Sequence, residues 1–181
     1  MDISKIIQKR RTIYPVNYTQ KKISKSFIKL LLKIANSAPS HKLTQPWFFK
    51  VYKGKSKNVL CEIIQKIDKE KDSAVKINKF IEKVKSSDTI ISVCMTKDKS
   101  NRVPEWEEVA AVSMAVQNMW LSCYVYNIGS YWSTPALKDD YAKHSGLNSN
   151  QKSLGFFFMG SYKHIETPKV REGLNSKVEW I

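Results

Sequence analysis

The sequence predicts one α+β domain over residues 1–181. Two observations indicate this class. Several segments space their apolar residues by three and four, as one face of a helix does, and others are short runs of β-branched and aromatic residues that suit strands. The chain is 181 residues long and 42% hydrophobic, which suffices for one complete core. We therefore expect an ordered globular protein with mixed helix and strand content.

The first quarter of the chain predicts two helices and one strand. Asp2 is expected to cap a short helix that ends near Arg10. Residues 13–23 are polar and extended, because Tyr14-Pro15 disfavours helix. Residues 24–37, capped by Ser24, are apolar round most of a helix and should be buried. The bulky run at 47–52 predicts a buried strand.

The middle of the chain continues this alternation. Residues 56–66 and 74–84 each place apolar side chains on one helical face. Between them, the charged residues 66–73 predict a solvated, mobile connection. Residues 89–96 have the β-branched content of a central strand.

The longest helix is predicted at 104–127, and Gly129 is expected to stop it. Apolar residues cover too much of this helix for an ordinary surface position, so it should lie in the core or in a dimer interface. The remaining elements are a short strand at 130–132, a capped helix start at 133–135 that continues through 138–144, a buried strand at 153–160 and a polar tail.

A loop at residues 38–47, Ala-Pro-Ser-His-Lys-Leu-Thr-Gln-Pro-Trp, carries hydroxyl, imidazole and amide groups that a ligand could contact. Three further segments accompany it in order: Arg10-Arg11-Thr12, residues 115–119 leading into Gly129-Ser130-Tyr131-Trp132, and Pro168-Lys169-Val170-Arg171. Together these segments resemble the nitroreductase family of FMN-dependent oxidoreductases, and most closely its small members with an Ala-Pro-x-His-Lys loop.

The resemblance implies a three-layer fold, in which helices flank a central, mainly antiparallel sheet of about four to five strands. It also implies a homodimer with FMN at the subunit interface. The implied reaction is the reduction of small electrophiles such as nitroaromatics and quinones by NAD(P)H, with ping-pong hydride transfer through flavin N5. No catalytic side chain and no metal are implied, because the flavin carries the chemistry.

By the same resemblance, the residues that hold FMN are Arg10, Arg11, Thr12, Ser37, Ser40, His41, Gln45, Trp132, Ser133, Thr134, Lys169 and Arg171. The arginine turn and the terminal basic pair would hold the ribityl chain and the phosphate. Ser40 and His41 would reach the flavin across the dimer interface, and the backbone amide of Thr134 would face N5. The chain departs from the family pattern at Leu43, where many members have Asn, and at Pro135, where many have Gly.

Other interpretations stay open. Lys9 and Arg10 could simply complement the dipole at a helix C-terminus. The net charge of +15 invites a nucleic-acid partner, but only four of the 31 basic residues are arginine, the residue favoured for bases and phosphates. The alternatives to an enzyme are therefore a flavin-binding protein with little turnover and, less well supported, a basic nucleic-acid or surface-binding protein.

Composition restricts the remaining classes. The three cysteines form no close pair and predict reduced core thiols, and the three histidines have no metal-ligand spacing. The chain has no signal-type apolar run and no stretch approaching the ~18 apolar residues of a membrane span. We therefore expect a cytoplasmic protein without a metal.

Overall fold

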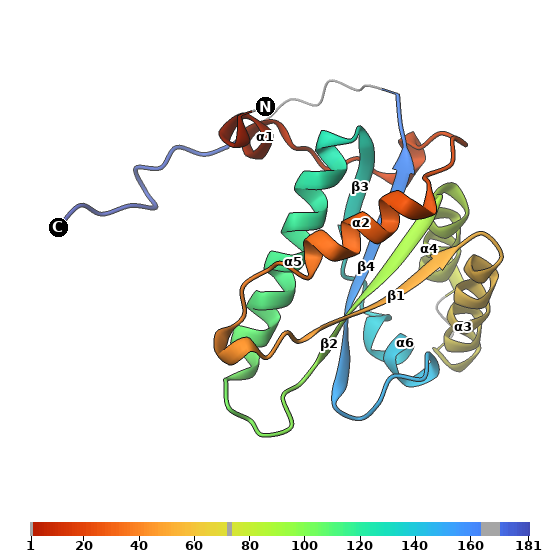
Figure 1. Cartoon of the computed structure of the whole chain (residues 1–181). Helices are drawn as coiled ribbons and strands as arrows, with labels where there is room; N and C mark the ends of the chain where they lie inside the picture. The colour runs from red at the N-terminus through yellow and green to blue at the C-terminus, as the bar shows by residue number, and fades with distance from the viewer. Residues whose placement is uncertain (1, 72–73, 164–170) are drawn as a thin grey trace.

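A four-stranded antiparallel sheet with the strand order β1-β2-β4-β3 forms the middle layer of the protein (Figure 1). The computed structural model describes residues 2–71, 74–163 and 171–181. The strands are β1 (Trp47–Lys53), β2 (Thr89–Thr96), β3 (Ile128–Ser133) and β4 (Gln151–Ser161). The predicted α+β class, with an antiparallel sheet between helices, is confirmed.

Helices cover both faces of this sheet. Within the described residues they are α1 (Ile3–Lys9), α2 (Lys25–Ala35), α3 (Ser56–Lys71), α4 (Ala74–Ser86), α5 (Glu105–Val125) and α6 (Lys138–His144). Two predicted caps are present, since the Asp2 carboxylate accepts from the amide of Ser4 at 2.9 Å and the Ser24 hydroxyl accepts from the amide of Phe27 at 3.1 Å.

The central strands alternate their side chains between two hydrophobic cores. On one face, Ile91, Val93 and Met95 of β2 pack with α2 and α5. On the other face, Ile90 of β2 packs with α3, α4 and α6, together with Phe156 and Phe158 of β4. Because both faces are covered, β2 is buried along nearly its whole length, which agrees with the central position that its sequence predicts.

Burial is lower than expected in two elements. Tyr52 is the one buried residue of β1, while Phe48 and Val51 are 37% exposed. The expectation of a buried strand is wrong because β1 lies at an edge of the sheet. In α2 the buried residues are Ile28, Leu31 and Ala35, so one stripe of this helix faces the core and the predicted burial round most of its surface is wrong for the single chain.

Three element boundaries also differ from the prediction. Helix α3 continues through 66–71, where a solvated connection was expected, and 72–73 lie outside the described residues. Helix α5 ends at Val125 because Asn127 adopts a φ of 54°, whereas Gly129 lies inside β3. No helix starts at 133–135, since Ser133 pairs with β4 and its hydroxyl accepts from the Tyr131 hydroxyl at 3.2 Å, so it caps nothing.

The end of β3 is held close to β4 by a glycine. Gly155 has a φ of 111°, and a Cβ at this position would lie 2.3 Å from the carbonyl oxygen of Ser133. The register of β4 against β2 shifts at the same level, between Val93 and Cys94. A residue with a side chain at 155 would therefore push Ser133 away from its present position.

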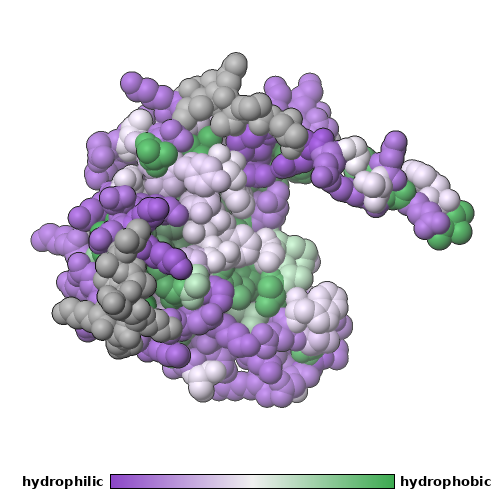
Figure 2. All heavy atoms as spheres, turned by 180° about the vertical axis from the view of Figure 1, so that it is seen from behind, coloured by the Kyte–Doolittle hydropathy of each residue, from purple (hydrophilic) through white to green (hydrophobic). Residues whose placement is uncertain are grey.

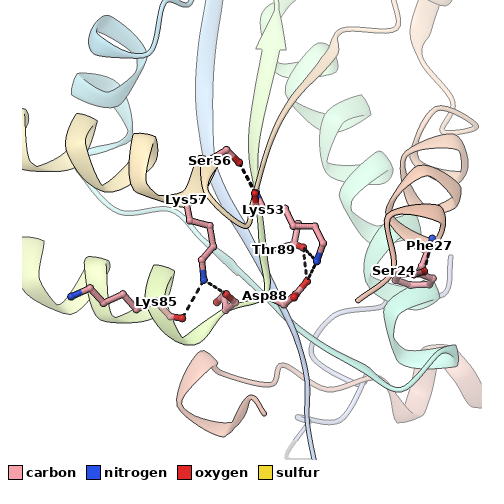
Figure 3. Close-up of polar contacts among 9 residues, drawn as sticks. Ser24, Phe27, Lys53, Ser56, Lys57, Lys85, Asp88 and Thr89 are labelled. Atoms are coloured by element: carbon pink, nitrogen blue, oxygen red, sulfur yellow. Dashed lines mark hydrogen bonds and ion pairs between the residues drawn. The ribbon is translucent and has the colours of Figure 1, made fainter. Parts of the chain in front are cut away.

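Polar contacts fix the C-terminal end of α4 against its neighbours (Figure 3). The Lys57 ammonium of α3 donates to the carbonyl oxygens of Lys85 at 3.2 Å and Ser87 at 2.5 Å. The Lys53 ammonium of β1 pairs with the carboxylate of Asp88, directly beyond α4. Helix α4 is thus tied to α3 and to an edge of the sheet.

The last residues, 171–181, lead away from the body of the protein in both orientations (Figures 1 and 2). Trp180 is 94% exposed, and Ile181 is also fully exposed. Two apolar residues at the end of a polar tail indicate that this terminus docks on another surface, and the resemblance to the nitroreductase family implies that this surface is a partner subunit. No contact within the described chain covers it.

Candidate functional site

A stacked pair of side chains joins the end of α1 to α5. The guanidinium of Arg10 lies 4.5 Å from the ring centre of Trp120. Its Nη1 atom is buried and has no hydrogen-bond partner among the described residues. Since a buried unsatisfied donor is costly, this position is suited to an anionic ligand that accepts from the guanidinium.

Two more arginines lie close to this pair. Burial lowers the pKa of Arg10, and the nearby positive charges of Arg171 and Arg11 lower it further. The Arg11 guanidinium donates to the backbone carbonyls of Gln8 and Arg10, each at 2.9 Å, which fixes the turn after α1. The structure therefore brings Arg10, Arg11 and Arg171 together from opposite ends of the chain.

Two other residues, Thr12 and Lys169, were predicted for the phosphate end of the site. Thr12 is half-buried directly after the arginine turn. Lys169 lies outside the described residues, so the predicted basic pair is represented by Arg171 alone.

Trp120 contributes a donor that the sequence interpretation did not assign to the site. Its indole Nε1 is buried and, like Arg10 Nη1, has no hydrogen-bond partner in the described parts of the chain. The ring also makes an edge contact with Phe157 of β4 at 5.9 Å. Sequence spacing along α5 indicated only packing for this residue, because the contact with Arg10 joins positions far apart in the chain.

The loop between α2 and β1 has an irregular but well-connected backbone. Lys42, Leu43 and Gln45 all have positive φ angles. The Ser40 hydroxyl accepts from the amide of Gln45 at 3.1 Å. Ser37 donates its hydroxyl to the carbonyl of Lys33 at 3.3 Å, at the end of α2.

This loop is attached to the first turn of α5. The imidazole Nδ1 of His41 lies 2.5 Å from the Glu107 carboxylate, and the Lys42 ammonium donates to the carbonyl of Arg102 at 3.0 Å. Trp120 is thirteen residues further along the same helix, which corresponds to about 20 Å. Within one chain, the loop and the arginines therefore lie at opposite ends of α5 (Figure 1).

The end of β3 supplies the third part of the predicted site. Ser133 is buried, and Thr134 is exposed directly after it. The indole of Trp132 donates to the carbonyl of Leu154 at 3.2 Å, so its N–H already has a partner inside the fold. What remains available to a ligand here is the exposed Thr134 segment and the face of the strand end.

A cavity with a volume of ≈ 550 Å³ adjoins this turn. Ser133, Pro135 and Leu137 line one side of it, and residues of α4 line the other. Its size is within the range of small-molecule sites.

Metal and membrane sites are not found in the described ranges. Among residues 2–71, 74–163 and 171–181, no group of three or more His, Cys, Asp or Glu could hold a metal ion. In the same part of the chain no helix is long and apolar enough to cross a membrane. All three cysteines are free; Cys94 and Cys123 are buried and Cys61 is half-buried.

Comparisons with known proteins give a consistent result. A model of the nitroreductase family matches residues 7–161. The Escherichia coli (strain K12) protein YdjA, named as an NAD(P)H nitroreductase, is 25% identical over 137 residues, which cover 72% of this chain and 73% of YdjA.

Two solved structures have the same fold. A nitroreductase-like family protein from Bacillus cereus superposes with a TM-score of 0.90 at 25% identity, over 100% of this chain and 96% of that one. The FMN-dependent nitroreductase NfnB from Mycobacterium smegmatis, solved in complex with NADPH, has a TM-score of 0.76 at 15% identity, over 98% and 97% of the two chains. Since the family model spans most of the sequence, the protein belongs to the nitroreductase family and is an oxidoreductase.

Proposed function

We propose that the protein is an FMN-dependent oxidoreductase that uses NAD(P)H to reduce small electrophiles such as nitroaromatics and quinones. The observation that carries the cofactor assignment is the buried, unpartnered Nη1 of Arg10 beside Arg11 and Arg171. Three clustered cations fit a phosphate dianion, which accepts several charge-assisted hydrogen bonds at once.

The phosphate end would use Arg10, Arg171, Lys169 and the indole N–H of Trp120. The guanidinium offers a fork of N–H donors, while the indole offers one. Both donors lose water when they are buried, so a phosphate oxygen would replace hydrogen bonds that the fold itself does not supply. Arg11, which is engaged with backbone carbonyls, would mainly fix the turn and add positive charge.

The flavin ring of FMN would lie at the C-terminal end of β3, against the exposed Thr134. From Ser130, whose carbonyl accepts from the amide of Ile13, to Ser133 the strand extends about 10 Å, a separation that suits an extended mononucleotide. The backbone amide of Thr134 can donate to a flavin ring nitrogen, whereas Pro135 has no amide to add. Bound FMN would supply the hydride chemistry, accepting from NAD(P)H and giving to the acceptor.

The loop residues Ser37, Ser40, His41 and Gln45 would act on the flavin of a second copy. Their place at the far end of α5, about 20 Å from the arginines, is too distant for one chain to use both parts around one ring. A homodimer would solve this, because a second copy can present its loop where the first lacks one. His41 is exposed beyond its contact with Glu107, as this role requires.

No side chain is proposed as a proton donor or acceptor in the slow step. Fixed amide and cationic donors would stabilise the charge that develops on reduction. Because the nucleotide and the acceptor would occupy the same place in succession, we expect ping-pong kinetics.

An absorbance spectrum of the purified protein tests the proposal. We expect flavin bands, release of FMN on denaturation, and parallel double-reciprocal lines when NAD(P)H and a quinone are varied together. Flavin bands without NAD(P)H oxidation would indicate a binding protein with little turnover. A colourless protein that FMN cannot reconstitute, with salt-dependent affinity for nucleic acid, would contradict the proposal.

A further inference from the structure

The cavity beside the end of β3 has an apolar floor and a cationic rim. Ile77 and Phe80 of α4 and Leu137 line its interior, and Phe80 also stacks edge-on with Phe156 at 4.9 Å. The cavity is adjacent to Ser133 and Pro135, the turn at which the flavin ring is proposed to lie. A flat, unsaturated molecule would contact aromatic and aliphatic surface here.

Three lysines of α4 border this cavity: Lys76, Lys79 and Lys83. Their spacing of three and four residues places them on one side of the helix. The Lys83 ammonium lies 5.3 Å from the ring centre of Tyr131, and the Tyr131 hydroxyl donates to Ser133. Lys83 therefore connects this row of lysines to the end of β3.

The position of this row is set by the fold. Beyond the last lysine, the end of α4 is held by the Lys57 ammonium, which donates to two carbonyl oxygens, and by the Lys53–Asp88 pair (Figure 3). Ile77 and Phe80, on the same helix as the lysines, are 2% and 4% exposed, so the helix is also packed against the core. The lysines thus project from a fixed element beside the cavity.

The charges around the cavity are not balanced. Asp140 is the carboxylate among its described lining residues, and this residue is 9% exposed. Its carboxylate lies 3.6 Å from the ammonium of Lys143, which partly neutralises it. Within the described residues the three rim lysines form no ion pair, so the mouth of the cavity carries a net positive charge.

We propose that this cavity selects planar electron acceptors that carry a carboxylate or sulfonate group, in preference to neutral acceptors of the same shape. The acceptor's ring would rest on the apolar floor beside the flavin, and its anionic group would face Lys76, Lys79 and Lys83. This inference rests on the proposed function for the redox step but concerns the substrate class of the site.

Matched acceptors test the inference by kinetics. The kcat/KM of the purified holoenzyme is measured with 4-nitrobenzoate and with its neutral analogue 4-nitrobenzamide at low salt. Exposed ion pairs contribute up to about fivefold each, so we expect a preference of about tenfold for the anion from three lysines. The preference should shrink as ionic strength rises.

Variants locate the effect. In K76Q/K79Q/K83Q the preference should fall to about twofold or less, since the rim loses its charge. The control K55Q/K66Q/K85Q removes the same net charge at positions that do not line this cavity and should keep the preference. Equal kcat/KM values in the wild type, or a preference that K76Q/K79Q/K83Q retains in full, would overturn the inference.

Non-reducible probes separate this inference from the proposed function. Benzoate and benzamide binding to the same protein preparations is measured by ligand-observed NMR, which needs no turnover. Tighter binding of benzoate that K76Q/K79Q/K83Q abolishes supports the inference even if the protein is colourless, an outcome that would overturn only the FMN assignment. Equal binding of the two probes to a flavin-loaded protein overturns the inference alone.

Discussion

The two helical layers cover the same sheet but present different outer surfaces. In the α2/α5 layer, apolar residues remain exposed: Leu30 by 39%, Trp106 by 69% and Met114 by 40%. In the α3/α4/α6 layer, Val59 is the large hydrophobic residue that stays exposed among the described positions. Because exposed apolar clusters commonly mark interfaces, the first layer suits a second copy, whereas the lysine-rich second layer suits solvent and small ligands.

Met114→Glu should have the largest effect, because it tests whether the α2/α5 surface is covered. A charge without a partner in an apolar interface costs several kcal/mol, so we expect association to weaken about a hundredfold or more and FMN to be lost with it. Sedimentation velocity at micromolar concentration measures the change. The matched control, Val59→Glu in the other layer, should stay associated, and equal behaviour of the two variants would remove the distinction between the layers.

Arg171→Ala should weaken FMN binding by roughly ten- to a hundredfold, since a charge-assisted hydrogen bond contributes about 1.5 to 3 kcal/mol. Titration of the apoprotein with FMN and with riboflavin measures this, and riboflavin affinity should hardly change because it lacks the phosphate. Lys177→Ala is a suitable control, as this lysine lies in the same tail and pairs with Glu172. Equal weakening of both ligands would make Arg171 structural.

The pH dependence of cysteine alkylation compares the accessibility of the two helical layers. Burial raises the pKa of the half-buried Cys61 thiol of α3 and, more strongly, raises that of Cys123 of α5 to about 12. Because the thiolate reacts and the pKa of Cys61 is raised, alkylation of Cys61 should rise about tenfold per pH unit through the usual thiol pKa near 9 and beyond it, while native Cys123 stays unlabelled. Mass spectrometry after iodoacetamide treatment assigns the sites. Rapid labelling of Cys123 at pH 8 would show that the α5 layer opens.

Trp120→Phe removes one donor while keeping an aromatic ring beneath Arg10. We expect a three- to tenfold loss of FMN affinity, since a neutral hydrogen bond contributes about 1 kcal/mol. Riboflavin affinity should be retained, and the quenching of tryptophan fluorescence by FMN should decrease. A variant with unchanged FMN affinity would return Trp120 to a packing role.

Thr134→Ala should have the smallest effect, because the backbone amide is the proposed donor at that position. We expect less than a twofold change in kcat/KM for NAD(P)H and for a quinone. A loss of tenfold or more would show that the hydroxyl participates. The bell-shaped pH profile that a proton-donating side chain would produce should be absent, and His41→Ala should leave the pH dependence of turnover unchanged.

Local sequence patterns predicted where helices and strands occur better than they predicted the burial and tertiary contacts of these elements. The β-branched run at 89–96 and the caps at Asp2 and Ser24 follow from neighbouring residues alone, and the structure has them. The exposure of β1 could not be predicted in this way, because composition does not tell an edge strand from a central one. The helix start predicted at 133–135 is wrong for a similar reason, because a local pattern does not show which group a side chain will contact. The hydroxyl of Ser133 accepts from Tyr131 rather than from a helix amide.

In the candidate site, too, some residues could be predicted from short motifs and others could not. Short motifs identified Arg10 and Arg171, and their proximity in the structure supports that choice without testing each predicted ligand. Trp120 was missed because its role depends on stacking with Arg10, a tertiary contact with no local signal. The separation of the 37–45 loop from the arginines could also not be predicted from spacing, since it depends on which end of α5 each segment contacts.

The loop between α2 and β1 has a thermodynamic consequence. Three non-glycine residues, Lys42, Leu43 and Gln45, hold left-handed conformations, which are unfavourable for free chains. They are maintained by the contacts of Ser40 with Gln45 and of Lys42 with Arg102. The loop therefore loses its conformational entropy when the chain folds, so a ligand that contacts it binds a pre-organised surface and need not order the backbone again.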